Sequence, residues 1–165
     1  LDIADVLHRY RDKHEPLREI KLGESISNEE LLQLDCTVLV PAALSEQITH
    51  ANASKLRCRI LAEGANGPTT LEADRILTDK GVFIIPDILA NSGGVIVSYF
   101  EWVQDVQRFF WKAKDIQDRL QDIITSAFHR TLQFSVEKRT TMRMAALMSG
   151  IDKVAQAHLQ RGLYP

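Results

Sequence analysis

The chain has 165 residues, of which 45% are hydrophobic and 25% charged, and its formal net charge at pH 7 is −2. This length and apolar content suit one compact domain with a real core. The charge balance excludes the broad basic surface of a nucleic-acid-binding protein. No apolar run approaches the roughly 20 residues that a membrane-spanning helix needs.

Cysteine and histidine usage points to a cytoplasmic protein. No signal peptide opens the sequence, and Cys36 and Cys58 are expected to be buried thiols in a reducing compartment. The five histidines show no metal-type clustering. We therefore expect a cytoplasmic location, no bound metal, no nucleic-acid partner and no membrane partner.

Two helices are predicted in the N-terminal part of the chain. Residues 2–13 repeat apolar side chains at helical spacing. Ser27, with Glu30 three residues later, forms a capping box that predicts the start of a short helix through Leu34.

Strands and helices then alternate. In chain order they are a strand at 36–40, a helix at 49–56, a strand at 59–62, a second helix, and a strand at 82–85. A capping box of Thr69 and Glu72 predicts the start of the second helix, and Gly81 predicts its end. This alternation implies a parallel sheet with right-handed crossovers. The strands are continuous apolar runs, which predicts burial on both faces.

The rest of the chain is predicted to be helical. Three helices are expected at 92–111, 115–138 and 140–162, and the last carries apolar residues at helical spacing. The expected fold is therefore α/β: a partial, doubly wound parallel sheet of about three strands with flanking helices and a C-terminal helical segment.

Each predicted strand ends in small or polar residues. Ala42 and Ala43 follow the first strand, Asn66 lies in the segment AEGANGPTT (62–70) after the second, and Asn91 lies in PDILANSGG (86–94) after the third. Parallel strands bring these ends to one edge of the sheet, where open α/β proteins bind ligands. An asparagine amide matches a carboxamide or a ribose hydroxyl. The alternative is that Asn66 and Asn91 only build turns or cap helices.

The helix after the third strand offers further candidates. Gly93 and Gly94 open it, either to present amide groups to an anion or to let the helix pack closely on the sheet. Val95 and Ser98 share one face. If that face borders the crevice, Ser98 binds a substrate carboxylate while Val95 packs on methylenes; otherwise Ser98 bonds the preceding turn. Residues 109–111 are expected to contact another element or subunit.

These motifs, together with residues 34–43 and 93–102, closely resemble the glutamate dehydrogenases and, more broadly, the glutamate, leucine, phenylalanine and valine dehydrogenase superfamily. The resemblance runs through the whole chain, and AEGANGPTT favours the glutamate branch. It implies that residues 1–111 form the second half of a Rossmann-like NAD(P)-binding domain, on which the C-terminal helices of residues 112–165 pack.

The resemblance also implies an oxidoreductase activity: reversible oxidative deamination of L-glutamate to 2-oxoglutarate and ammonia with NAD or NADP. Ala42 and Ala43 would line the cofactor cleft. Asn66 would contact the nicotinamide ribose and Asn91 the carboxamide.

On the substrate side, the resemblance implies that Val95 and Ser98 face the glutamate side chain, with Ser98 at its distal carboxylate. The family's catalytic lysine and aspartate and its glycine fingerprint lie in a part that precedes Leu1, so we expect no catalytic residue in this chain. The absence of an initiator methionine fits an excised fragment, and we expect no turnover from it alone.

The edge of the sheet suggests association. The strand at 36–40 would be an open edge, so we expect a homo-oligomer that forms along this edge or through apolar helix faces. Two other functions stay open: a non-catalytic nucleotide-binding or oligomerisation module, and a leucine, phenylalanine or valine dehydrogenase, against which Ser98 argues.

Overall fold

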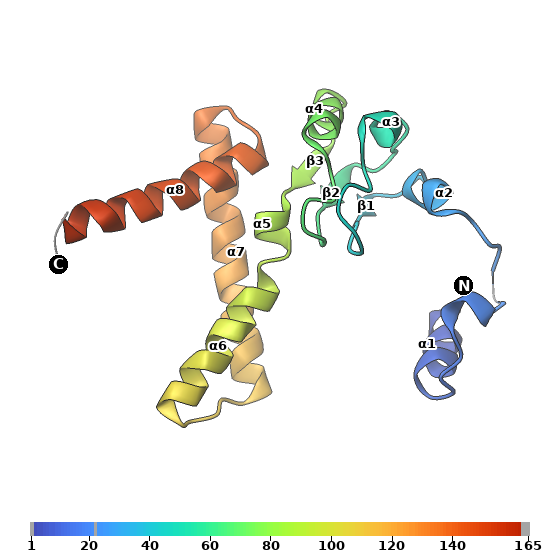
Figure 1. The fold of residues 1–165 in the computed structure, drawn as a ribbon, viewed down its shortest axis with the longest axis horizontal. Coiled ribbons are helices and arrows are strands. Elements are labelled where there is room, and N and C mark those ends of the chain that lie inside the picture. Colours follow the sequence, from blue (N-terminus) through green and yellow to red (C-terminus); the bar gives the residue numbers. More distant parts are fainter. Residues whose placement is uncertain (1, 22, 163–165) are drawn as a thin grey trace. The chain divides into compact units, whose positions relative to one another are not determined.

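The structure, a computed structural model, describes residues 2–21 and 23–162, and the chain divides after Leu34 into two compact units. In chain order the elements are α1 (Ile3–Arg11), the 3-10 turn η1 (Leu17–Glu19), α2 (Asn28–Leu32), β1 (Val38–Leu39), α3 (His50–Ala53), β2 (Ile60–Ala62), α4 (Leu71–Asp79), β3 (Phe83–Ile85), α5 (Asp87–Ala90), α6 (Gly93–Gln107), α7 (Ala113–Lys138) and α8 (Met142–Arg161) (Figure 1). Across the described ranges, no helix has the length and apolarity to cross a membrane.

The first unit, residues 1–34, contains α1, η1 and α2, and both predicted helices are present. Asp2 caps α1, which ends at Arg11 rather than at residue 13. The predicted capping box starts α2: Ser27 Oγ accepts from the Glu30 amide at 3.1 Å, and Glu30 Oε2 accepts from the Ser27 amide at 2.8 Å. These bonds from Ser27 hold the pKa of Glu30 below its ordinary value.

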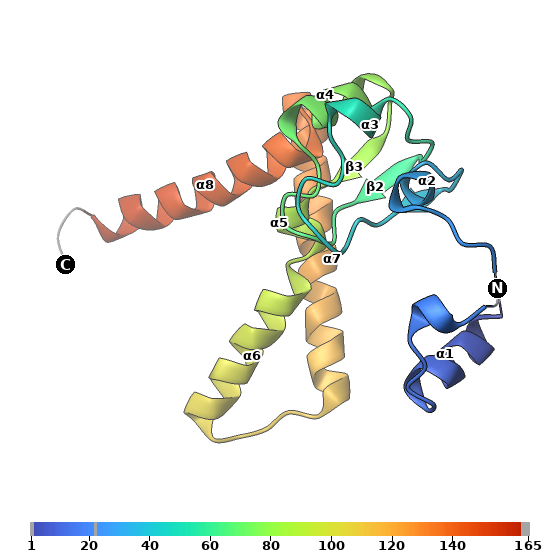
Figure 2. The same ribbon diagram turned by 45° about the vertical axis from the view of Figure 1, so that its right-hand side comes forward.

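The second unit, residues 35–165, contains the sheet, and its topology confirms the prediction. The strand order is β1-β2-β3, and both pairs are parallel. Each strand is shorter than its predicted range. The helices α3 and α4 provide the crossovers that return the chain to the start of the next strand, as the views in Figures 1 and 2 show. All three carboxyl ends therefore lie at the same edge.

The helix α4 begins one residue later than predicted. Its cap is Thr70, whose Oγ1 accepts from the Ala73 amide at 3.3 Å. The predicted cap, Thr69, instead forms an isolated parallel bridge with Ile48. Two adjacent threonines offer the same local chemistry, and the long-range bridge decides which one caps the helix.

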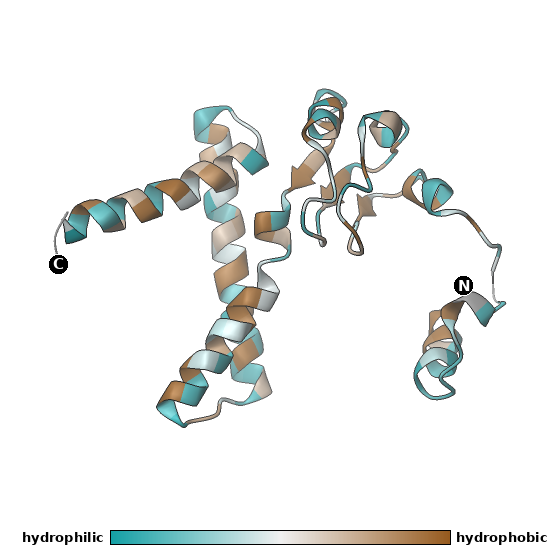
Figure 3. Cartoon of the chain, in the orientation of Figure 1, coloured by the Kyte–Doolittle hydropathy of each residue, from teal (hydrophilic) through white to brown (hydrophobic). Residues whose placement is uncertain are grey.

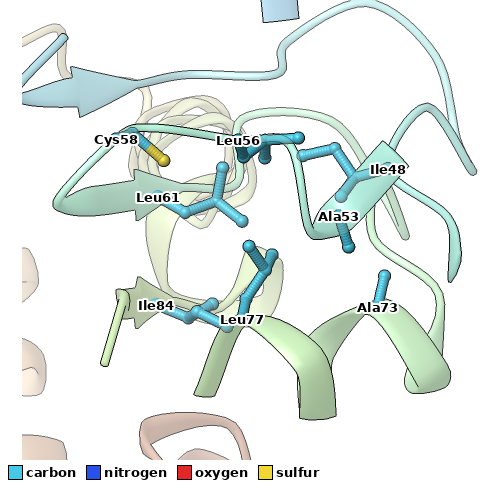
Figure 4. Close-up of a cluster of buried hydrophobic side chains, with 8 residues drawn as sticks. All are labelled: Ile48, Ala53, Leu56, Cys58, Leu61, Ala73, Leu77 and Ile84. Carbon is cyan, nitrogen blue, oxygen red and sulfur yellow. The ribbon is translucent and has the colours of Figure 1, made fainter. Parts of the chain in front are cut away.

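The core of the second unit lies between the sheet and the two crossover helices. Figure 4 shows eight buried side chains from β2, β3, α3, α4 and the segments beside them: Ile48, Ala53, Leu56, Cys58, Leu61, Ala73, Leu77 and Ile84. The prediction that every strand is buried on both faces is wrong for β1, because Val38 is 48% exposed. A strand at the edge of the sheet has a neighbour on one side only.

The C-terminal segment is helical as predicted, with corrected boundaries. A separate short helix, α5, precedes α6, and α6 ends at Gln107 instead of residue 111. Arg108 takes the left-handed conformation (φ 54°), and the buried Gln104 side chain accepts from the Trp111 amide at 2.7 Å. These two features turn the chain into α7. In both ribbon views α6 and α7 lie side by side (Figures 1 and 2).

Candidate functional site

The loops after β1 and β2 approach each other closely beyond the carboxyl ends of these strands. The Ala65 amide donates to the Pro41 carbonyl at 2.9 Å. A Cβ added at Gly64 would lie 3.1 Å from the Ala42 Cβ, tighter than an ordinary contact, so this approach depends on glycine. The backbone thus fixes the spacing of the first two loops.

The loops after β2 and β3 are joined by the two predicted asparagines. Asn91 Nδ2 donates to Asn66 Oδ1 at 2.6 Å, across 25 residues of sequence. Asn91 is also the C-terminal cap of α5, where its backbone amide donates to carbonyls of that helix. Its side chain, however, serves this long-range contact. Turn building alone therefore does not account for the pair.

These three loops and the start of α6 line a cavity of about 870 Å³ that is open to solvent. Its lining consists of residues 43–45, residues 64–66, Ile88, Asn91, Ser92 and Val95. Most of these side chains are small, and the two asparagines supply amide donors and acceptors. The cavity can therefore take a flat polar group and match its hydrogen bonds.

The structure brings four of the six predicted site residues together and leaves two outside. Ala43, Asn66, Asn91 and Val95 line the cavity, whereas Ala42 does not. Ala42 is exposed and faces Gly64 at the side of the cavity.

Ser98 lies one helical turn beyond Val95 on α6. It is exposed and does not line the cavity. At the start of the same helix, a Cβ added at Gly93 would lie 3.5 Å from Ile124 Cδ1. Gly93 therefore faces α7 at an ordinary van der Waals distance.

An ion cluster that the sequence analysis missed lies behind the cavity. Arg143, at the start of α8, contacts three carboxylates: Nη2–Glu63 Oε1 at 2.7 Å, Nε–Asp74 Oδ1 at 2.8 Å and Nη1–Asp87 Oδ1 at 3.4 Å. Glu63 is fully buried. The second carboxylate oxygens of Glu63 and Asp87 bind backbone amides, since Glu63 Oε2 accepts from Asp87 and Asp87 Oδ2 accepts from Gly67, both at 2.8 Å.

The three carboxylates stabilise the charged form of Arg143. Burial opposes the charged form of Arg143, but hydrogen bonds to Glu63 and Asp74 outweigh it and raise the arginine's pKa above its ordinary value. One sequence signal pointed to this cluster: a glutamate directly after a buried strand needs a cationic partner. No local spacing identifies Arg143, which lies 80 residues from Glu63.

Within residues 2–21 and 23–162, no group of three or more histidine, cysteine, aspartate or glutamate side chains is arranged to hold a metal ion. The cavity offers amides, small side chains and backbone groups in its place.

A parallel sheet whose strand ends surround one polar cavity is the ligand-binding arrangement of open α/β folds that bind nucleotides. The chain belongs to the Glutamate/Leucine/Phenylalanine/Valine dehydrogenase family, whose model matches residues 1–162. This result confirms the resemblance that the strand-end motifs indicated.

Sequence relatives narrow the comparison to glutamate dehydrogenases. The chain is 46% identical over 164 residues to a glutamate dehydrogenase of Thermotoga maritima, covering 99% of this chain and 39% of that protein. It is 44% identical over 162 residues to a cryptic catabolic NAD-specific glutamate dehydrogenase of Bacillus subtilis, covering 98% of this chain and 38% of the relative. The chain therefore spans well under half the length of these relatives.

Solved structures show the same fold. A hetero-hexameric glutamate dehydrogenase of Thermus thermophilus matches 100% of this chain and 38% of that chain, with a TM-score of 0.87 and 29% identity. A glutamate dehydrogenase of Peptoniphilus asaccharolyticus matches 76% of this chain and 32% of that chain, with a TM-score of 0.73 and 38% identity. The three-stranded parallel sheet and its helices are thus a segment of the glutamate dehydrogenase fold.

Proposed function

We propose that this chain supplies the cofactor cavity, and part of the substrate surface, of an NAD(P)-dependent glutamate dehydrogenase. The activity is the reversible oxidative deamination of L-glutamate to 2-oxoglutarate and ammonia. The observation that carries the proposal is the Asn66–Asn91 hydrogen bond beyond the carboxyl ends of the parallel strands. The identity of about 45% to glutamate dehydrogenases supports it.

The cavity residues fit a nicotinamide nucleotide. Ala43, Gly64 and Ala65 leave room beside the backbone for a flat ring or a ribose. The Asn66–Asn91 bond uses one N–H of Asn91 and one lone pair of Asn66, so both side chains keep further capacity for a ligand. Two relatives bear NAD-specific names, which favours NAD over NADP.

In this proposal, Asn91 binds the nicotinamide carboxamide and Asn66 the adjoining ribose, while Ala42 and Ala43 border the cofactor. Val95 packs against the methylenes of glutamate, and Ser98 holds its distal carboxylate. The bound nicotinamide ring supplies the hydride chemistry. Our proposal assigns binding and orientation to these residues, and no proton-transfer residue to this chain.

The experiment is a fluorescence titration of the 165-residue chain with NADH, using Asn66→Ala and Asn91→Ala. One hydrogen bond contributes about 0.5–1.5 kcal/mol, so each variant should lose roughly 2- to 12-fold in affinity. Gln121→Ala, which removes an exposed amide on α7, is the matched control and should bind like the unaltered chain.

The same titration separates the competing functions. A scaffold that has only kept the fold would be indifferent to both asparagine substitutions, and this result would contradict our proposal. We also expect no glutamate-dependent reduction of NAD by the chain alone. Turnover by the isolated chain would show that the proposed division of labour is wrong.

Association between copies is part of the proposal. Among the described strands, β1 forms one edge of the sheet, and its Val38 is exposed. The helix α8 also carries exposed apolar residues such as Ile151 and Val154. Figure 3 shows brown, hydrophobic bands along this helix. We propose a cytoplasmic homo-oligomer. Analytical ultracentrifugation that finds only monomer at high concentration would contradict the association.

A further inference from the structure

The first turn of α8 delivers one arginine to the carboxyl end of the sheet. Thr141 caps this helix through its Oγ1, which accepts from the Met144 amide at 3.3 Å. Met142 and Ala145 are buried, so this turn is anchored on both sides of Arg143. The backbone that carries the Arg143 guanidinium to Glu63 is therefore held in place by the buried residues beside it.

Two of the three residues whose carboxylates contact Arg143, Glu63 and Asp87, are also hydrogen-bonded to each other. Glu63 uses one oxygen for Arg143 (2.7 Å) and the other for the backbone amide of Asp87 (2.8 Å). Asp87 in turn accepts from the Gly67 amide at 2.8 Å. Gly67 has a φ of +53°, a left-handed conformation that suits glycine. The chain Arg143–Glu63–Asp87–Gly67 thus joins the loop after β2 to the start of α5.

Gly67 and Asp87, which are hydrogen-bonded to each other, each lie close in sequence to one of the cavity asparagines. Asn66 immediately precedes Gly67, and Asn91 is the cap residue at the far end of the single helical turn that Asp87 begins. The asparagine pair, with 2.6 Å between Nδ2 and Oδ1, and the cluster therefore join the same two segments of the chain.

We propose that Arg143 is a positioning residue of the cofactor cavity. Through Glu63 and Asp87, it holds the loops after β2 and β3 at the separation that presents Asn66 and Asn91 together to one nicotinamide nucleotide. This inference rests on the proposed function. It adds a residue of the C-terminal helix that does not line the cavity.

The test measures NADH affinity of the 165-residue chain with Arg143→Met and Arg143→Lys. We expect Arg143→Met to weaken binding about 10-fold, the size of effect known for residues that orient metal ligands from behind. Arg143→Lys should restore part of the affinity, because it keeps the charge but loses the planar fork. Arg75→Met, on the exposed surface of α4, is the matched control and should bind normally.

A double-variant cycle separates positioning from a general loss of stability. If Arg143 acts through the two asparagines, adding Arg143→Met to the pair Asn66→Ala/Asn91→Ala should change affinity less than 2-fold further. Additive losses would overturn the inference. Should Arg143→Met leave the chain unfolded, the pair Glu63→Gln/Arg143→Met also neutralises Glu63, the fully buried carboxylate of the three, and the same expectations apply to it.

A nuclear magnetic resonance measurement needs no cofactor. The side-chain amide signals of Asn66 and Asn91 should shift in Arg143→Met and stay in place in Arg75→Met. If NADH binding depends on Asn91 but not on Arg143, the positioning role is wrong and the proposed function stands. If the unaltered chain does not bind NADH, the proposed function fails and this inference fails with it.

Discussion

Replacing Leu77 by alanine tests whether the crossover helices are held to the sheet by the core in Figure 4. Leu77, on α4, is 0% exposed. The substitution removes three carbons, worth about 2.4 kcal/mol at about 0.8 kcal/mol each. The cavity left behind raises the expected loss of unfolding free energy to about 3–4 kcal/mol. A domain of ordinary stability, about 5–15 kcal/mol, would remain folded.

The assay is urea denaturation followed by circular dichroism, and Leu71→Ala is the control. Leu71 lies on the same helix but is 70% exposed, so its replacement should change stability by less than about 0.5 kcal/mol. The two variants should share the m-value of the unaltered chain. A loss below about 1 kcal/mol for Leu77→Ala, or equal losses for both variants, would refute the reasoning.

Two further predictions concern buried polar and titratable groups. Gln104→Leu should lower stability by about 1–3 kcal/mol in the same assay, because the Trp111 amide loses its acceptor; an unchanged midpoint would show that this bond does not shape the turn. Burial, followed by the charge of Cys36, raises the pKa of the Cys58 thiol. A thiol that holds its proton more tightly when folded contributes stability that is complete below the ordinary thiol pKa of about 8.5 and is lost as pH rises through the higher folded pKa. Under reducing conditions, Cys58→Ala should therefore lose less stability between about pH 7 and pH 10 than the unaltered chain, and parallel losses would argue against a shifted Cys58.

The topology could be predicted because it follows from local patterns. Short apolar runs alternating with helical patterns predict parallel strands, and the carboxyl ends of such strands meet at one edge. Ala43, Asn66 and Asn91, which follow the three strands, line one cavity for this reason. Capping chemistry gave the start of α2 for the same reason, since Ser27 and Glu30 interact within one turn.

Long-range contacts explain what the sequence pattern could not predict. The predicted cap of α4 was Thr69, but Thr70 caps the helix because Thr69 forms a parallel bridge with Ile48. The turn after α6 depends on Gln104 binding an amide seven residues later, in a stretch whose apolarity resembles a continuing helix. Ser98 shares a helical face with Val95, yet only Val95 reaches the cavity. How a helix is directed past a site depends on its packing.

The ion pair between Arg143 and Glu63, which are 80 residues apart in the sequence, also has a consequence for biosynthesis. A nascent polypeptide that has left the ribosome as far as α7 already contains the three described strands and both asparagines. Its buried glutamate, however, still has no cation. We therefore expect sheet formation and maturation of the ligand cavity to be separate events during translation, with the second waiting for the first turn of α8 to emerge.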